Sequence, residues 1–418
     1  MTTRQMLKIA KAQCGRALLL TEEEKNRAIL AMADRIEAEK EFILAANAKD
    51  MEAAQYKLSA AMLDRLMLNE SRVAQMTDGM RKVAALPDPV GRVLSRVERP
   101  NGLTIEKTTV PIGVVAIIYE SRPNVTSDAA VLAFKSSNVC VLRSGRDSFL
   151  SATAIVAAMR RGLADAGLSE DFIHLVPDPS RASASELMKA DGLVDVLIPR
   201  GGAGLIQSCL EQATVPCIQT GTGICHIYVH ESANWTDALN ILDNAKTQRP
   251  SVCNAMEVCL VDRAIAKEFL PLMKKRLVDD RQREGLQPVE LRLCPVAQSL
   301  VAGTPAEEKD FDTEFLDYVL AVKVVDGPQE AVAHIATHST GHSEAILCRD
   351  SAVADAFCRQ VDSAAVYVNA STRFTDGGEF GLGCEMGIAT QKLHARGPMG
   401  LAELVSYKYI VRGNGQIR

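Results

Sequence analysis

Short apolar runs alternate with helical patterns along most of this chain, from Val114 onward. The first series contains the runs GVVAIIYE, NVCVLRSG, FIHLVP, LVDVLIPRGG and TVPCIQTG. A second series, after Gly223, contains CHIYVHE, EVCLVD, VELRLCP, LAVKVVDG, SEAILCRD and AAVYVNAS. Continuous apolar strands separated by helices predict parallel sheets that helices cover on both faces. Since 418 residues exceed what one hydrophobic core organises, the two series predict two α/β domains.

Helices and a hairpin precede this alternation. Residues 3–86 have helical periodicity, with a capping-box pattern at Thr21. The segment GRVLSRVERPNGLTIEKTTV then places Asn101-Gly102 between two alternating runs, which predicts a β-hairpin. A two-stranded ribbon is marginal alone in water, so the hairpin should pack against another domain or subunit. The final run, YKYIVRG, is predicted to be a strand that could pair with the hairpin of a neighbouring molecule.

Charge and composition exclude several classes of protein. The net charge of -5 and the pI near 5.9 give no electrostatic basis for binding nucleic acid or an anionic membrane. No apolar run approaches the roughly 20 residues of a membrane-spanning helix. The N-terminal residues interleave polar and apolar side chains, which indicates an amphipathic helix rather than a signal peptide. We therefore expect a cytoplasmic protein. The 11 cysteines form no CxxC pair and no Cys/His cluster at zinc spacing, so no metal site is expected.

One cysteine stands apart from the others. Cys253 lies in NAKTQRPSVCNAMEVCLV, where Pro250 ends a helical pattern shortly before an apolar run begins. Such a junction presents side chains to a cleft more often than it buries them, and Arg249 lies close enough in sequence to favour a thiolate. We predict that Cys253 is a nucleophile that forms an acyl intermediate. The alternative is a small buried hydrophobe, as most cysteines are, and Cys384 in GLGCEMG is a weaker second candidate.

Glycine-rich loops follow several of the apolar runs. RSGRDS and PRGGAGL lie at predicted strand ends, where open α/β sheets bind nucleotides, although a strict GxGxxG is absent and plain turn glycines explain them nearly as well. TRFTDGGEFGLGCEMG is too long for a simple turn, and its aromatic and charged residues argue against disorder. We expect this stretch to be functional.

Several long motifs resemble the aldehyde dehydrogenase superfamily, and their wording resembles its gamma-glutamyl phosphate reductase branch. They are YESRPNVT, NAKTQRPSVCNAMEV, GTGICHIYV, VYVNASTRFTDGGEFGLG and TQKLHARGPMGL. The resemblance implies two Rossmann-like parallel-sheet domains and a small β arm for oligomerisation. It assigns residues 1–90 and 110–224 to an NADPH-binding domain, 225–366 to a catalytic domain, 367–402 to a Gly-rich segment returning toward the cofactor domain, and 91–109 and 403–418 to the arm.

The resemblance also implies a reaction. NADPH would reduce gamma-glutamyl phosphate to glutamate 5-semialdehyde with release of phosphate, the second step from glutamate to proline. An acyl phosphate carries a good leaving group, so the Cys253 thiolate would displace phosphate and hold a thioester that accepts hydride. Asn124 in SRPNVT resembles the oxyanion-hole Asn of the superfamily, and its alternative is a turn cap at a strand end. QTGTGICHIYV contains no acidic residue where aldehyde-oxidising members carry a general base, which favours reduction.

The remaining site residues follow from the same resemblance. Cofactor contacts are expected from Arg143, Ser144, Gly145, Gly201, Gly202 and Glu314. Arg143 suits the 2′-phosphate of NADPH, although the ordinary role of such an arginine is a surface charge at the end of a strand. Residues 137 and 144 are Ser where the branch carries Gly. This departure puts the preference for NADPH over NADH in doubt. Arg122 and Arg373 are expected to bind the substrate carboxylate, with structural salt bridges as the alternative.

Partners and rival functions complete the expectation. A homo-oligomer, dimer or tetramer, is expected, together with a transient contact with glutamate 5-kinase. The main rival is an acylating or oxidising aldehyde dehydrogenase that acts on another semialdehyde, and the missing base argues against the oxidising form. The other rival is that the chain is a catalytically silent family member that serves as a binding partner. The presence of both Cys253 and Asn124 argues against it.

Overall fold

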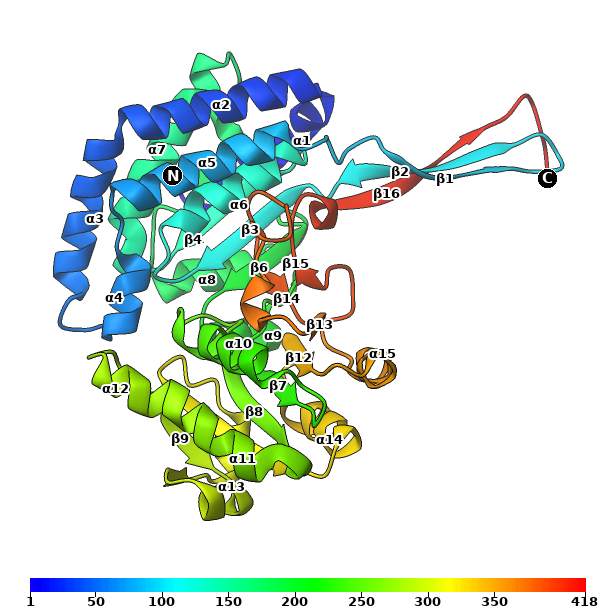
Figure 1. Cartoon of the computed structure of the whole chain (residues 1–418). Coiled ribbons are helices and arrows are strands. Elements are labelled where there is room, and N and C mark those ends of the chain that lie inside the picture. Colours follow the sequence, from blue (N-terminus) through cyan, green and yellow to red (C-terminus); the bar gives the residue numbers. More distant parts are fainter. The chain divides into compact units, whose positions relative to one another are not determined.

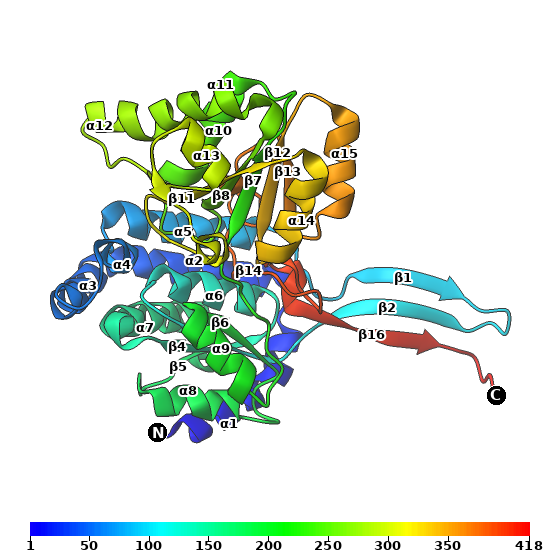
Figure 2. The same ribbon diagram turned by 90° about the horizontal axis from the view of Figure 1, so that it is seen from below.

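The computed structural model describes residues 1–418, with all side chains except those of Ala60, Ala61 and Ala203. The chain forms two compact units. The first contains Met1–Thr220, Gly381–Gly387 and Leu393–Arg418, and the second contains Gly221–Phe380 and Ile388–Lys392. Each unit is described by itself below, with the element labels of Figure 1 and Figure 2. No helix in the described chain is long and apolar enough to cross a membrane.

The first unit is built on a parallel sheet with the order β5-β4-β3-β6. Its strands are β3 (Val114–Tyr119), β4 (Val139–Ser144), β5 (Ile173–Leu175) and β6 (Val196–Arg200). The helices between and after them are α6 (Asn124–Lys135), α7 (Phe149–Asp165), α8 (Arg181–Met188) and α9 (Ala203–Gln212). All residues of β3 and β4 are buried, as the continuous apolar runs predict. The run TVPCIQTG, by contrast, forms isolated bridges at Cys217, which pairs with Leu197, and at Thr220 rather than a continuous strand.

Five helices form the N-terminal part of this unit, and their predicted helical character is confirmed. They are α1 (Thr3–Leu19), α2 (Glu22–Ala38), α3 (Lys40–Ala54), α4 (Ala60–Leu66) and α5 (Glu70–Ala85). Thr21 begins α2 with a capping box to Glu24. α2 packs on α7 so closely that a Cβ on Gly162 would lie 2.5 Å from the Cα of Met32. The helices therefore cover the sheet of the first unit.

A three-stranded antiparallel arm projects from the rest of the first unit (Figure 1). Its strands are β1 (Val93–Glu98), β2 (Thr104–Pro111) and β16 (Val405–Arg412), in the order β1-β2-β16. The predicted hairpin is confirmed, but the expected partner of the last strand was wrong, because β16 pairs with β2 of its own chain along its full length. Every residue of β1 is exposed, so the arm still presents an uncovered edge strand.

The second unit contains a seven-stranded parallel sheet with the order β10-β9-β11-β8-β7-β12-β13. The strands are β7 (Cys225–Val229), β8 (Met256–Asp262), β9 (Glu290–Leu293), β10 (Thr304–Pro305), β11 (Val319–Val325), β12 (Ser343–Leu347) and β13 (Ala365–Val368). The helices are α10 (Trp235–Thr247), α11 (Arg263–Lys274), α12 (Arg281–Arg283), α13 (Pro295–Leu300), α14 (Pro328–His338) and α15 (Ser351–Gln360). All residues of β7 and β8 are buried, which makes these two central strands a rigid base for the loops before them. Two short strands, β14 (Ile388–Ala389) and β15 (Gly397–Pro398), lie in the Gly-rich C-terminal region.

Candidate functional site

Cys253 lies in the loop between α10 and β8 of the second unit, at the amino end of β8. Its side chain is partly exposed, whereas the next residue, Asn254, is 5% exposed. Pro250 follows the end of α10 and prevents the helix from continuing, as the sequence predicts. The nucleophile candidate is therefore accessible on a loop whose neighbouring residue is anchored in the interior.

The segment before β7 lies directly against the backbone of Cys253. A Cβ on Gly223 would lie 1.5 Å from the carbonyl oxygen of Cys253, so only glycine fits at this position. The Sγ of Cys225 donates to the same carbonyl oxygen at 3.2 Å. Burial raises the pKa of the Cys225 thiol, so this group remains a neutral donor. The two contacts fix the backbone of Cys253 from one side.

A second loop, after β13, holds the residue that follows Cys253. The Nδ2 of Asn254 donates to the carbonyl oxygen of Thr375 at 3.0 Å and to that of Arg373 at 3.3 Å. In return, the Oγ1 of Thr372 donates to the carbonyl oxygen of Asn254 at 2.7 Å. The first residues of the Gly-rich motif that we expect to be functional therefore hold the Cys253 loop in place.

Arg373 extends from this motif toward the same loop. Its Nε donates to the Oε1 of Gln248 at 3.0 Å, and its Nη1 donates to the Oδ1 of Asn254. Burial lowers the pKa of Arg373, the charges of Asp376 and Cys253 raise it, and the neighbouring Arg249 lowers it further. The structure therefore brings Arg373 and Cys253 together, with a second guanidinium nearby.

A buried ion pair closes the base of the Cys253 loop. Lys246, in the last turn of α10, donates to Glu257, the second residue of β8, at 2.5 Å, and both side chains are fully buried. Burial raises the pKa of Glu257, and its second oxygen accepts the backbone N–H of Leu316 at 3.1 Å. Leu316 has a positive φ of 54°, which turns the chain back sharply after Glu314. The pair thus ties the two ends of the loop to this turn.

Glu314 contacts the same neighbourhood. Its Oε1 accepts the backbone N–H of Gly223 at 2.8 Å. QTGTGICHIYV contains no acidic residue of its own, but the fold brings one to it from a distant part of the sequence. That carboxylate is engaged in holding the glycine segment against Cys253. Whether Glu314 also contacts the nicotinamide ribose stays a prediction.

Asn124 is the first residue of α6, directly after β3, in the first unit. Its side chain is exposed, and its Nδ2 donates to the Oδ2 of Asp128 one turn later at 3.1 Å. Burial raises the pKa of Asp128 to about 6, with Glu385 contributing and Arg200 opposing. The proposed oxyanion donor is therefore oriented by a carboxylate, which the sequence reading did not identify.

Cys384, the second thiol candidate, lies beside Asp128. Its side chain is 7% exposed, and burial together with the Asp128 carboxylate raises its pKa. A neutral buried thiol is a poor nucleophile. These surroundings favour Cys253 over Cys384.

The strands of the first unit end together and place three loops at one edge. Tyr119 is paired with Ser144 on one side and with Arg200 on the other, so Glu120, Gly145 and Gly201 follow at the same level. The N–H of Gly145 donates to the carbonyl oxygen of Tyr119 at 2.7 Å. A carboxyl edge of this kind is where open α/β sheets bind nucleotides.

An acidic side chain lies among the glycines of this edge. A Cβ on Gly201 would lie 2.4 Å from the Oε2 of Glu120, and the N–H of Gly202 donates to that oxygen at 3.1 Å. Gly202 is the N-cap of α9, so the start of this helix already binds an anionic group. Glycines and a helix start of this kind are typical of a phosphate site, but the Glu120 carboxylate occupies the helix start here, and contact of Gly201 and Gly202 with the pyrophosphate stays a prediction.

Arg143, expected near the 2′-phosphate, is 7% exposed rather than solvated. Its Nη2 donates to the carbonyl oxygens of Pro179 and Ser180 at 2.8 and 2.7 Å. Ser144 is also buried. A phosphate contact by Arg143 stays a prediction, and so does the assignment of Arg122, a partly buried residue of the first unit.

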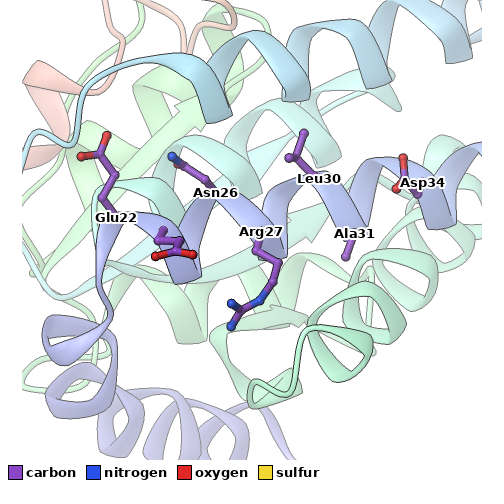
Figure 3. Close-up of a pocket in the computed structure, with 7 residues that line it drawn as sticks. Glu22, Asn26, Arg27, Leu30, Ala31 and Asp34 are labelled. Atoms are coloured by element: carbon purple, nitrogen blue, oxygen red, sulfur yellow. The ribbon is translucent and has the colours of Figure 1, made fainter.

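A shallow hollow on the first unit contains none of these residues (Figure 3). It is lined by Glu22, Glu23, Asn26, Arg27, Leu30, Ala31 and Asp34, all from α2. Glu22 and Asn26 contact the Nζ of the buried Lys135, so these two residues have a structural role. We assign this hollow no role in catalysis.

The chain has strong likenesses to known proteins. Residues 2–299 match the model of the aldehyde dehydrogenase family. A gamma-glutamyl phosphate reductase from Neisseria meningitidis serogroup C is 58% identical over 416 residues, which cover 100% of this chain and 99% of that protein. One from Streptococcus gordonii is 60% identical over 398 residues, 95% of each. The crystal structure of gamma-glutamyl phosphate reductase from Thermotoga maritima matches with a TM-score of 0.93 and 43% identity over 100% of both chains. These likenesses confirm the predicted fold class.

Proposed function

The chain belongs to the gamma-glutamyl phosphate reductases of the aldehyde dehydrogenase family, and we propose that it reduces gamma-glutamyl phosphate to glutamate 5-semialdehyde with NADPH, releasing phosphate. It is an oxidoreductase that uses a nicotinamide cofactor. The single observation that carries the mechanism is the accessible thiol of Cys253, on a loop whose backbone is fixed by Gly223, Cys225 and Asn254.

Cys253 begins the reaction as a thiolate. Its sulfur attacks the acyl carbon of the substrate, the new carbon–sulfur bond forms, and the carbon–oxygen bond to phosphate breaks. Phosphate leaves with the electron pair of that bond, and the glutamyl group remains on Cys253 as a thioester. The fixed backbone of the loop holds the sulfur in position, which is worth several kcal/mol when reacting atoms must meet in one geometry.

Reduction of the thioester completes the cycle. The reduced nicotinamide, when bound, supplies a hydride to the thioester carbon. The resulting oxyanion needs preorganised donors, and we assign this role to the Nδ2 of Asn124 and the backbone N–H of Cys253. One such donor is typically worth about 3–4 kcal/mol. Collapse of the tetrahedral species breaks the carbon–sulfur bond, releases the aldehyde and regenerates the thiolate of Cys253.

Hydrolysis of the thioester would waste the substrate, and the surroundings of Cys253 oppose it. The segment Gln219–Val229 carries no acidic residue that could activate water. Glu314, the carboxylate that reaches this segment, accepts a backbone N–H of Gly223 at 2.8 Å. We infer that this bond keeps the carboxylate occupied and favours reduction over oxidation.

Cofactor and substrate contacts follow the same assignment. Gly145, Gly201 and Gly202 would admit the pyrophosphate at the start of α9, and we assign Arg143 to the adenosine ribose, with Ser144 beside it. Glu314 would contact the nicotinamide ribose. Arg122 and Arg373 are the cations proposed for the anionic groups of the substrate.

The arm supports a proposal about assembly. Val93, Leu94 and Val97 of β1 and Tyr407, Tyr409 and Val411 of β16 are exposed apolar side chains on a narrow ribbon. Such surfaces mark contacts between chains more often than free surfaces. We propose a homo-oligomer formed through the arm, located in the cytoplasm. A transient contact with glutamate 5-kinase also stays a proposal.

A phosphate-dependence experiment tests the proposed function. The purified protein is mixed with NADP⁺ and glutamate 5-semialdehyde, and the absorbance of NADPH is followed with and without inorganic phosphate. The proposal predicts turnover that requires phosphate and saturates with it. Oxidation of the aldehyde at the same rate without phosphate would show an oxidising dehydrogenase instead.

A further inference from the structure

The guanidinium of Arg373 is oriented by neutral groups rather than by an acid. Its Nε donates to the side-chain amide of Gln248 at 3.0 Å, and its Nη1 donates to the amide of Asn254. Both partners belong to the loop that carries Cys253, one of them its immediate neighbour. Amide oxygens fix the direction of a guanidinium without cancelling its charge. Arg373 is therefore a positioned cation beside the nucleophile.

The charges around Arg373 also favour a role as an anion-binding residue. Arg249 lies close enough to lower its pKa, so two guanidinium groups share this region. The carboxylate that acts on the pKa of Arg373 is Asp376, whose Oδ1 accepts the backbone N–H groups of Gly378 and Glu379 at 2.8 and 3.4 Å. The thiols of Cys253 and Cys225 also act to raise the pKa of Arg373. Arg373 is partly buried and Arg249 is exposed, and the positive charge of this region is matched to an anionic ligand.

The substrate offers two anions, and their positions distinguish them. The phosphate is attached through one oxygen to the carbon that Cys253 attacks, whereas the α-carboxylate lies at the far end of the glutamyl chain. A cation close to the sulfur of Cys253 therefore meets the phosphate. Phosphate also carries about −1.5 to −2 charges near neutral pH, which suits two guanidinium groups better than a single carboxylate does.

We propose that Arg373, held by Gln248 and Asn254, binds the phosphate group of the acyl phosphate and retains it as the leaving group beside Cys253. This inference rests on the proposed function and assigns one substrate contact within it. The positive charge stabilises the oxygen that gains the electron pair when the carbon–oxygen bond breaks. In the reverse direction the same contact positions inorganic phosphate for attack on the thioester. The α-carboxylate is then left to other residues, with Arg122 as the first candidate.

Two variants test the contact in different ways. Arg373→Gln removes the guanidinium, and Gln248→Glu keeps Arg373 but offers it a carboxylate that competes with phosphate. Gln248 is exposed, so a new carboxylate is tolerated there. Arg263→Gln is the matched control, because Arg263 is a surface arginine of the same unit paired with Asp326. Circular dichroism and thermal melting show that each variant is folded.

The assay is the phosphate-dependent oxidation of glutamate 5-semialdehyde, with KM measured separately for phosphate and for the aldehyde. We expect KM for phosphate to rise about 10- to 100-fold in Arg373→Gln, the usual effect of losing a charge-assisted hydrogen bond, and by a smaller factor in Gln248→Glu. KM for the aldehyde should stay within about twofold in both, and Arg263→Gln should match the wild type.

The opposite split would overturn the proposal. If KM for the aldehyde rises and KM for phosphate does not, Arg373 binds the α-carboxylate instead. Should Arg373→Gln fail to fold, Gln248→Glu decides the question alone, and an unchanged KM for phosphate there counts against the contact. A wild-type enzyme that needs no phosphate would refute the proposed function itself, which is a distinct result.

Discussion

Gly223→Ala is the substitution that most directly probes how Cys253 is held. The added Cβ would lie 1.5 Å from the carbonyl oxygen of Cys253, 2.5 Å from its carbonyl carbon and 2.9 Å from its Cα. Real Cβ atoms essentially never approach within 3.0 Å, so the two backbones must separate by about 1.5 Å. Neither neighbour is the flexible end of a side chain. Gly223 lies beside β7, and the Cys253 loop leads into β8, both of which are buried.

The displacement of the two backbones should lower both the free energy of unfolding and kcat. Overpacking of this kind typically costs about 1–3 kcal/mol of the free energy of unfolding. A misplacement of about 1 Å at the reacting centre can lower kcat about 100-fold, so a shift of this size should lower it at least that much. KM for phosphate and the affinity for NADPH should change less, because the shift is local to the nucleophile. Urea denaturation and the phosphate-dependent assay measure the two effects.

The control is Gly15→Ala. Gly15 lies in α1, where a Cβ meets nothing within 4 Å, so alanine should raise the free energy of unfolding by about 0.5–1 kcal/mol and leave kcat unchanged. Gly223→Ala with wild-type kcat would refute the reasoning, because it would mean that the position of the Cys253 backbone is not critical.

Three further predictions concern buried charge and the arm. Asp128→Asn should raise the free energy of unfolding by about 1–2 kcal/mol at pH 7.5, because the folded-state pKa of Asp128 is raised to about 6 and the ionised form is destabilising above it. The gain should fall as the pH drops below about 6 and vanish below about pH 3, where the carboxyl is protonated in both states, and a pH-independent effect in urea denaturation would argue against this. Lys246→Met leaves Glu257 buried without its cation and should cost about 3–5 kcal/mol, while the double change with Glu257→Leu should recover most of it. Equal losses in the single and double variants would show that the unpaired carboxylate of Glu257 is not the cause of the cost. Replacing the exposed Val97 and Tyr409 by Lys should dissociate the oligomer in light scattering, and an unchanged mass would exclude the arm as the interface.

Periodicity and turn chemistry predict most of the fold. The continuous apolar runs become the buried strands β3, β4, β7 and β8, and Asn101-Gly102 lies at the turn of the predicted hairpin. The partner of β16 was wrong, because an amphipathic C-terminal strand does not specify whether β2 of its own or of another chain receives it. TVPCIQTG was also wrong as a full strand, since the run forms only isolated bridges, at Cys217 and Thr220.

The site was harder to predict than the sheets. Cys253 could be singled out because Pro250 breaks a helix before it, a local signal. Gln248 and Asn254, which hold Arg373, carry no comparable signal, because their role depends on a loop more than 100 residues away in sequence. Glu314 was expected to contact the cofactor, and its bond to Gly223 could not be read from spacing.

The supporting charges were missed for the same reason. Asp128 follows Asn124 by four residues on a helix, which is a readable i,i+4 pair, yet nothing in the sequence indicates its partial burial. Glu120 lies beside Gly201 only because β3 and β6 are neighbours in the sheet. Pairings between distant segments determine these contacts, and one sequence alone does not show them.

The central claim is that Cys253 carries the acyl group, and the turnover of Cys253→Ser tests it most directly. A serine hydroxyl is far less ionised than a thiol, so the account predicts a loss of kcat of at least about 10³-fold in the phosphate-dependent assay. Thermal stability and NADPH binding should remain close to those of the wild type, because the substitution changes one partly exposed atom. Near-normal turnover of folded Cys253→Ser would contradict the account.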